Sequence, residues 1–255
     1  MSMILAAFAL SLAWVQSDHA AASVPQPPAC EIEIFETSRF LVCAYMADRH
    51  DLRLVRNDLD PQRSRRLDAL LRDPDIERGR VRFAMNAGMF EESGRPLGLY
   101  VGEGRTGRAL NTRSGHRGNF YLMPNGVFFT DGRGHPFVVT SADWPDHADD
   151  AVWASQSGPM LVIDGALHPA IQHDGPSRRV RNGVGVIGEG AALFVLSLEP
   201  VSFGRLARFF RDGLGSENAL YLDGVVSGAW VPSLPRLDLI HRVGPVFVIS
   251  ERERR

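Results

Sequence analysis

An acidic residue at the end of an apolar segment is the first candidate for chemistry in this sequence. The run Leu220–Leu222 predicts a short buried strand, which stops at Asp223-Gly224. A carboxylate placed there can act as an acid or a base, and the glycine lets other groups approach it closely. The alternative is an Asx-type turn, in which the carboxylate binds only its own backbone. Taken alone, the stretch favours the turn.

Other polar residues also lie where predicted strands begin or end. Amide and hydroxyl side chains next to glycines suit a pocket that recognises hydroxyl groups by hydrogen bonding, as a sugar requires. The arginines at 178, 179 and 181 would in addition suit a phosphate, which guanidinium binds with two parallel hydrogen bonds. Each residue has a simpler explanation as a turn or surface residue, but together they predict a pocket for a polar, anionic ligand. These residues are Asn86, Asn119, Gln156, Ser157, Arg181, Asn182 and Asp223.

Several kinds of chemistry are excluded by the composition and spacing. All 28 basic residues are arginine, which excludes Schiff-base and lysine general-base catalysis. Ser157 does not lie in the strand–elbow–helix pattern of a hydrolase serine. The glycines at 102–107 match the dinucleotide-binding pattern in letters, but no helical period follows them. The histidines show neither a His-x-His pattern nor a helical pair, so we expect no metal site and no cofactor.

Length and composition predict a soluble globular protein. The chain has 255 residues, 44% hydrophobic residues and a net charge of −2. This length is enough to bury a substantial core, and we expect one domain over residues 30–255. The near-neutral charge gives no reason to expect nucleic acid or a membrane surface as a partner. The oligomeric state is left open.

The amino-terminal segment predicts export. Met3–Val15 is almost wholly apolar and is followed by small residues up to Ala22, which is typical of a secretory signal over residues 1–22. The segment is too short to favour stable insertion into a membrane. No Lys or Arg precedes it, so a buried amino-terminal helix is the alternative. Residues 23–29 are proline-rich and predict an extended linker.

The two cysteines support the same compartment. Glu31–Phe35 and Phe40–Ala44 are strand-like and flank Glu36-Thr37. A tight turn there would place Cys30 opposite Cys43, which is the arrangement that a cross-strand disulfide requires. The alternative is a pair of inert buried thiols.

The fold predicted from these patterns is α+β, with mixed or antiparallel sheets of short strands and two main helices packed against them. One helix is predicted at 60–71, and Ser202 caps the other at 202–214. Two helices cannot cover both faces of a large parallel sheet, so a doubly wound fold is disfavoured. The predicted strands cover residues 81–85, 97–101, 119–123, 127–130, 160–163, 183–187, 192–198, 220–222 and 245–249, with hairpin signals at 124–126 and 164–165.

Five separated blocks of the sequence resemble one known family. In this order, over roughly residues 30–248, they resemble the phosphodiester glycosidase family and most closely its bacterial secreted branch. The departure is Val225-Val226, where the family carries further glycines, and two β-branched residues restrict the backbone there. The blocks are Ala84–Phe90, Asn119–Phe128, Gln156–Val162, Arg181–Gly185 and Asn218–Gly224.

The resemblance implies hydrolysis of the bond between a sugar anomeric carbon and a phosphodiester oxygen. It implies that Asp223 is the base or nucleophile, that Arg181 holds the departing phosphate and that Asn86 orients the sugar or water. A phosphate diester is a good leaving group, so one prominent carboxylate would suffice where ordinary glycosidases use two. Candidates for a second carboxylate are Asp164, Glu91 and Glu92. The substrate-binding residues implied are Gly88, Phe90, Asn119, Asn125, Gln156, Ser157, Asn182, Gly224 and Ser227.

The substrate expected is a sugar phosphate or a polysaccharide in the periplasm or outside the cell. The main alternative is a non-catalytic glycan- or polyanion-binding protein of the cell envelope, for which Val225-Val226 is the best support. A second alternative is an envelope assembly factor without a small-molecule site.

Overall fold

The structure is a computed structural model that describes residues 29–56, 66–67, 76–224, 226–234 and 242–253. The predicted signal, most of the predicted linker and most of the helix predicted at 60–71 lie outside these residues. No helix in the described ranges is long and apolar enough to span a membrane.

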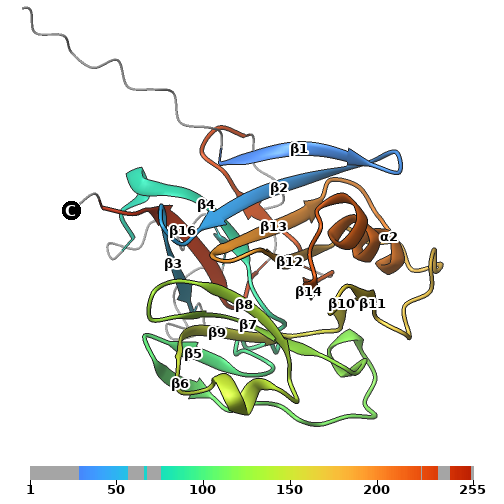
Figure 1. Ribbon diagram of the computed structural model, residues 1–255, viewed down its shortest axis with the longest axis horizontal. Coiled ribbons are helices and arrows are strands. Elements are labelled where there is room, and N and C mark those ends of the chain that lie inside the picture. Colours follow the sequence, from blue (N-terminus) through green and yellow to red (C-terminus); the bar gives the residue numbers. More distant parts are fainter. Residues whose placement is uncertain (1–28, 57–65, 68–75, 225, 235–241, 254–255) are drawn as a thin grey trace, which may run out of the picture.

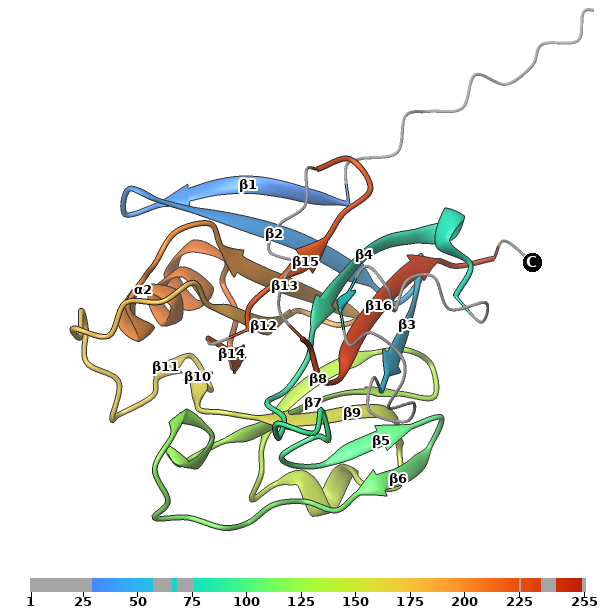
Figure 2. The same cartoon turned by 180° about the vertical axis from the view of Figure 1, so that it is seen from behind.

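Three antiparallel sheets make up most of the described chain (Figure 1). The seven-stranded sheet contains, in spatial order, β1 (Cys30–Phe35), β2 (Ser38–Met46), β13 (Ala191–Ser197), β12 (Asn182–Ile187), β14 (Asn218–Asp223), β10 (Met160–Ile163) and β11 (Ala166–Leu167). The four-stranded sheet, which is clear from behind in Figure 2, contains β15 (Ala229–Trp230), β4 (Val81–Asn86), β16 (Val246–Glu251) and β3 (His50–Val55). The five-stranded sheet contains β6 (Arg105–Arg108), β5 (Tyr100–Gly102), β9 (Ala151–Ser157), β7 (Gly126–Asp131) and β8 (Pro136–Thr140). Three 3₁₀ turns, η1 (Arg78–Arg80), η2 (Asn119–Tyr121) and η3 (Trp144–His147), complete the framework.

The central core lies where the three sheets face one another. Four phenylalanines from four strands, Phe83, Phe128, Phe194 and Phe247, meet edge to face with ring centroids 5.2 to 5.5 Å apart. Aromatic rings prefer this geometry, and each ring buries a large apolar area. Because every sheet contributes to this cluster, the strand ends around it are held in fixed positions.

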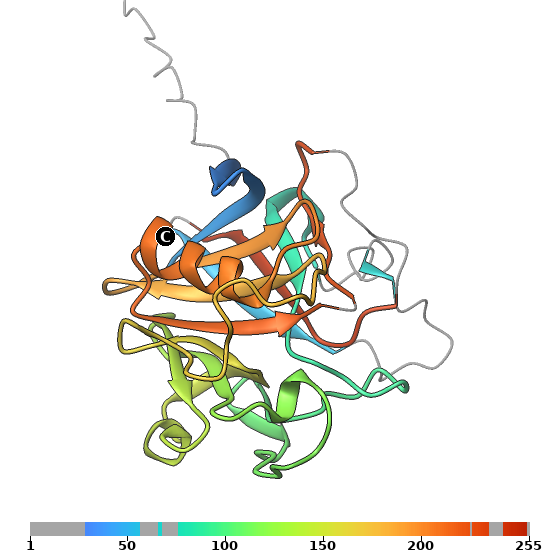
Figure 3. The same ribbon diagram turned by 90° about the vertical axis from the view of Figure 1, so that its right-hand side faces the viewer.

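One short helix covers the outer face of the seven-stranded sheet. It is α2 (Phe203–Arg208), and a single π turn, η4 (Phe209–Gly213), continues it. In Figure 3 the helix lies across the strands of this sheet. Phe210 lies against β12 at Gly183 and Gly185, where an added Cβ would come within 2.9 and 2.7 Å of the ring. The alternating glycines of the Arg181–Gly185 block therefore make room for the helix.

The antiparallel part of the fold prediction is confirmed, whereas two main helices are not borne out. Most of the helix predicted at 60–71 lies outside the described residues, and the one predicted at 202–214 forms the short helix α2 followed by the π turn η4. The described residues contain one α-helix of six residues. The physical reason is that the sheets cover one another around the shared core, so long helices are not needed to bury their apolar faces. Ser202 caps α2 as predicted, since its Oγ accepts from the backbone N–H of Arg205 at 3.1 Å.

The strand predicted at 119–123 is also wrong. Asn119–Tyr121 forms the 3₁₀ turn η2, and the Asn125 side chain donates to the carbonyl of Phe120 at 3.0 Å. That bond folds the chain back locally, where a strand would run straight. The hairpin predicted at 164–165 is confirmed by the pairing of β10 with β11.

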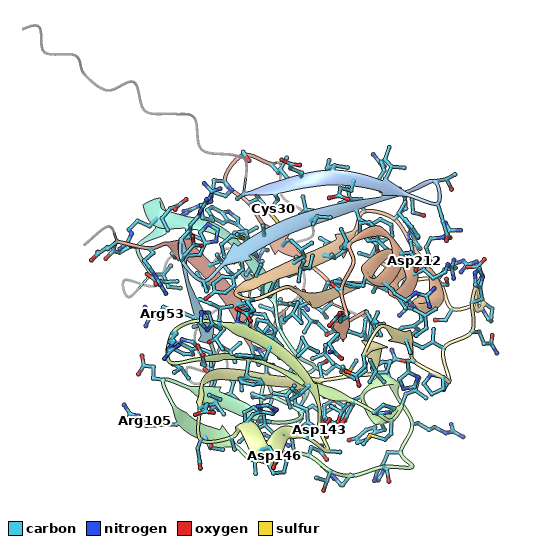
Figure 4. All side chains as sticks on the ribbon, in the orientation of Figure 1. Cys30, Arg53, Arg105, Asp143, Asp146 and Asp212 are labelled. Carbon is cyan, nitrogen blue, oxygen red and sulfur yellow. A yellow bond between two sulfur atoms is a disulfide. The ribbon has the colours of Figure 1, made fainter. Side chains whose placement is uncertain are left out.

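The predicted disulfide is confirmed. Cys30 and Cys43 are directly opposite in the β1–β2 register and are bonded at 2.00 Å. The turn between the strands holds Glu36 and Thr37 at φ values of 45° and 69°. Figure 4 labels Cys30 at the start of β1.

Removing the disulfide is expected to lower the free energy of unfolding by about 3 kcal/mol, because the bridge restricts the unfolded chain. The measurement is urea denaturation of Cys30→Ser, Cys43→Ser and the double variant. All three should lose the same amount, since either change breaks the bridge. A loss below about 1 kcal/mol in the double variant would contradict this expectation.

Candidate active site

Three strand ends from two sheets meet at Asn182. Strand β4 ends at Asn86, β12 begins at Asn182 and β14 ends at Asp223. The Asn182 Nδ2 donates to the backbone carbonyl of Asn86 at 3.0 Å and to its Oδ1 at 3.1 Å. The Asn182 Oδ1 accepts from the backbone N–H of Asp223 at 2.9 Å. Asn182 therefore fixes the position of Asp223 relative to Asn86.

The orientation of the Asn86 amide follows from its partners. Its Oδ1 accepts from Asn182 Nδ2 and from the backbone N–H of Gly228 at 2.8 Å, so the Nδ2 group must point the other way. Asn86 is 1% exposed, and no acceptor within the described chain lies within hydrogen-bond distance of its Nδ2. A buried donor without a partner is costly and uncommon. An unpartnered donor of this kind can mark a functional site.

Asp223 forms the Asx-type turn that its sequence context favours. Its Oδ1 accepts from the backbone N–H groups of Gly224 at 2.6 Å and Val226 at 3.4 Å. Ser227 Oγ donates to the Asp223 carbonyl at 2.9 Å, which closes the turn. The residue is 7% exposed. Such a turn is compatible with a catalytic role, because it holds the carboxylate in one orientation.

Arg181 is fully buried behind this turn. Its Nε donates to the carbonyl of Val201 at 2.9 Å, and its Nη2 donates to the carbonyl and hydroxyl of Ser177 at 3.1 and 3.0 Å. The guanidinium carbon lies 3.7 Å from the centre of the Phe203 ring. Within the described part of the chain no carboxylate is within salt-bridge distance. Burial lowers the pKa of Arg181, although arginine keeps its charge at neutral pH.

Tyr221 connects Arg181 with the Asp223 turn. Its hydroxyl accepts from Arg181 Nη1 at 3.0 Å, and burial raises its pKa well above the usual value. A Cβ added to Gly224 would lie 1.7 Å from the Tyr221 hydroxyl and 3.3 Å from Arg181 Nη1. The absence of a side chain at Gly224 therefore brings the Arg181–Tyr221 pair directly against the residue that follows Asp223.

Replacing Gly224 by alanine is expected to push Tyr221 away from Arg181 and to cost about 2 kcal/mol of stability, because overpacking a filled interior is destabilising. The measurement is a double-mutant cycle with Tyr221→Phe. Removing the hydroxyl clears the closest contact, so Gly224→Ala should cost less in the Tyr221→Phe background. Strictly additive losses would show that the two residues do not meet.

The five-stranded sheet contacts the site through Ser157. Its Oγ donates to the carbonyl of Leu222 at 2.7 Å, which attaches the end of β9 to β14. The neighbouring Ser155 accepts from the backbone N–H of Gly88 at 3.2 Å. A Cβ at Gly88 would lie 2.3 Å from the Gln156 carbonyl oxygen, so the loop that follows β4 and contains Gly88 packs tightly on β9.

Some predicted substrate-binding residues lie outside the Asn86–Asn182–Asp223 network. Gln156 uses its side chain internally: Oε1 accepts from the backbone N–H groups of Leu99 and Asn111, and Nε2 donates to Asn111 and Ser141. Asn119 is exposed on η2. Further residues in this group are Asn125, which is bonded to the Phe120 carbonyl, and Phe90, which packs on Gly244.

Two candidates for a second carboxylate, Asp164 and Glu91, bond residues outside the Asn86–Asn182–Asp223 network. Asp164 is bonded to Asn218, at the opposite end of β14 from Asp223. Glu91 pairs with Arg108 at 2.7 Å. No group of three potential metal ligands occurs among the described residues. The sequence analysis did not assign Tyr221 a role; it lies two residues before Asp223 on β14, and its hydroxyl accepts from Arg181.

The fold is shared with solved structures of low sequence identity. The catalytic domain of zebrafish N-acetylglucosamine-1-phosphodiester alpha-N-acetylglucosaminidase, auto-inhibited by its pro-peptide, has a TM-score of 0.61 at 15% identity, covering 91% of this chain and 87% of that chain. A hypothetical protein from Synechocystis gives 0.56 at 16% identity, covering 88% and 61%. A putative exported protein from Burkholderia pseudomallei gives 0.56 at 13% identity, covering 84% and 74%.

Sequence comparison gives the family. Residues 79–245 match the phosphodiester glycosidase family, and the chain belongs to it. The uncharacterized protein YigE of Escherichia coli strain K12 is 40% identical over 161 residues, which cover 63% of this chain and 62% of that protein. The chain thus matches less than two thirds of the length of this relative. The family match includes Asn86, Arg181 and Asp223.

Proposed function

We propose that the protein hydrolyses a sugar-1-phosphodiester at the bond between the sugar C1 and the phosphate oxygen, releasing free sugar and a phosphomonoester. Family membership supports this class of reaction. The proposal for the site rests on one hydrogen-bond network, in which the Asn182 side chain bonds both the Asn86 side chain and the backbone N–H of Asp223. It combines a buried carboxylate with a buried amide donor that has no acceptor in the described chain.

Asp223 and Asn86 would contact the reacting groups. Asp223 acts as base or nucleophile, a role in which a carboxylate must be held in position. The Asn86 Nδ2 donates to an oxygen of the sugar or of the attacking water. The phosphate leaves as a stable anion, so the reaction does not require a strong protein acid at the leaving group.

Arg181 would act on the phosphate from behind the turn. Direct contact would require exchange of one of its present hydrogen bonds, since Val201, Ser177 and Tyr221 occupy the guanidinium. Among the described residues no carboxylate is paired with Arg181, and a buried positive charge of this kind stabilises nearby negative charge strongly, because the interior screens it weakly. Arg181 therefore favours the departing anion and also keeps Tyr221 against Gly224.

The protein is also proposed to be exported. The Cys30–Cys43 disulfide supports an oxidising compartment. Protein isolated from the native host should begin near Ser23 and contain no titratable thiol. Amino-terminal sequencing and thiol titration check this, and an intact Met1 together with two free thiols would contradict it.

A non-catalytic glycan- or polyanion-binding protein is the second candidate. Val226, where the resemblance predicts a glycine, is partly buried against the core of the four-stranded sheet. Its backbone N–H also bonds Asp223, so the loop after the carboxylate is constrained.

The test is a screen of the purified protein against sugar-1-phosphodiesters that differ in sugar and aglycone, with phosphomonoester release as the readout. Turnover of one substrate supports the enzyme. Binding of the same compounds without turnover selects the binding protein. An absence of both binding and turnover would contradict both candidates.

A further inference from the structure

A cavity of about 390 Å³ lies at the end of the five-stranded sheet. It is formed by the turn between β7 and β8 and by the residues that end and follow η3. Its volume is within the range of small-molecule sites, roughly 300–1,000 Å³. The lining residues are Phe129, Asp131, Gly132, Arg133, Phe137, His147 and Asp150.

The floor of the cavity is aromatic. Phe129 is buried, and Phe137 stacks on it with ring centroids 5.0 Å apart and an interplanar angle of 19°. His147 and Trp144 contact the same ring at 5.4 and 5.5 Å. Phe137 itself is 38% exposed and is the one aromatic residue among the large hydrophobic side chains exposed in the described chain. It presents an apolar ring to the solvent beside polar groups.

The rim of the cavity is polar and partly fixed. Asp131 Oδ1 accepts from the backbone N–H groups of Arg133 at 2.9 Å and His135 at 2.8 Å, and its Oδ2 lies 3.4 Å from His135 Nδ1. These bonds set the shape of the turn. Arg133, His147 and Asp150 add donors and acceptors around Phe137. The two carboxylates outnumber the single arginine, so an anionic ligand is disfavoured.

We infer that this cavity is a second carbohydrate-binding site, which takes an uncharged pyranose unit with an apolar face on Phe137 and hydroxyl groups on the polar rim. An aromatic platform with convergent donors and acceptors matches a sugar, which has apolar C–H faces and hydroxyl edges. The site is separate from the candidate active site. Gly126 on β7 pairs with Ser157, which contacts the candidate active site. Asp131, on the rim of the cavity, lies five residues further along β7, which corresponds to about 17 Å at 3.4 Å per residue.

Because the cavity and the candidate active site are apart, the cavity can bind a long substrate without taking part in the proposed hydrolysis. A polysaccharide held at Phe137 would keep a second part of the same chain close to Asp223. Linking two binding events in this way raises the effective concentration at each site. Binding at the cavity does not depend on turnover, so the two proposals fail or succeed separately.

The test uses the full protein labelled with nitrogen-15 and neutral hexasaccharides of glucose, mannose and N-acetylglucosamine, with a hexamer of galacturonic acid as the charged comparison. At least one neutral hexamer should shift the amide signals of residues 131–137 and 147–150, and the charged hexamer should not. Phe137→Ala should weaken binding at least tenfold. Replacement of Ile34, an exposed apolar residue on β1, by alanine should leave binding unchanged.

Three results would overturn the inference. They are the absence of shifts at these amides with every neutral hexamer, shifts confined to residues around Asp223, and wild-type affinity in Phe137→Ala. Thermal unfolding of Phe137→Ala shows whether the variant is folded. If it is not, Asp150→Asn on the rim replaces it, with the same weakening expected.

Discussion

Asp223→Asn is expected to lower the rate of sugar-phosphodiester hydrolysis by about 10²–10⁴-fold, the usual cost of losing a positioned base. The change removes the charge and most of the basicity. The amide oxygen can still accept from the backbone N–H groups of Gly224 and Val226, so the turn is kept. The Michaelis constant should change little, because the loss falls on the chemical step. Steady-state kinetics and a thermal unfolding curve for each protein provide the measurement.

Asp164→Asn is the matched control. Asp164 also lies in an Asp-Gly turn, but it is exposed and sits at the far end of β14. Its replacement should leave the rate unchanged. An active Asp223→Asn enzyme would move the catalytic carboxylate elsewhere. Glu91 would then be the next residue to replace, since it follows the Asn86 loop.

Arg181→Met is expected to lower the rate on a sugar phosphodiester by about 10²-fold, as for loss of a group that stabilises developing charge. Methionine keeps much of the volume and removes the charge. The Michaelis constant should also rise, because substrate and transition state both carry the phosphate anion. The defect should shrink on a glycoside with a neutral, activated phenol as leaving group, since no phosphate is present there. The Asp223→Asn defect should persist on both substrates.

Arg178→Met controls for loss of a nearby arginine. Its side chain is 41% exposed and pairs with Asp174 on the surface, where such pairs contribute little. Its rate on both substrates should match the wild type. Unfolding in urea should show a loss of about 2–3 kcal/mol for Arg181→Met alone, because the Val201 carbonyl and Tyr221 hydroxyl lose a buried partner. Equal rate losses for Arg181→Met on the two substrates would refute its role toward the phosphate.

Local patterns were sufficient to predict the parts of the fold that depend on near neighbours. The Cys30–Cys43 pairing follows from two short strands and one tight turn. The end of β14 at Asp223 follows from an apolar run that stops at an Asp-Gly pair. The helical segment after Ser202 was likewise predicted with nearly its observed bounds, but its change from the α-helix α2 to the π turn η4 at Phe209 has no local signal in the sequence.

Asn86, Asn182 and Asp223 were named from the sequence among other candidates, but the geometry that brings these three together could not be predicted. Asn86 and Gln156 look alike in the sequence, since each is an amide next to a predicted strand. The structure gives Gln156 four internal hydrogen bonds, whereas Asn86 keeps a donor without a partner in the described chain. The partners of Gln156 lie 15 to 57 residues away, so no local pattern identifies them. The burial of Arg181 has the same cause.

The position of bond cleavage tests the central claim most directly. Hydrolysis of a sugar-1-phosphodiester in water enriched in oxygen-18 places the new oxygen on whichever atom the water attacks. Attack at the sugar C1, with Asp223 as base or nucleophile, predicts a phosphomonoester that contains no oxygen-18 by mass spectrometry. A phosphomonoester carrying one labelled oxygen per molecule would show attack at phosphorus and would contradict a glycosidase mechanism for this site.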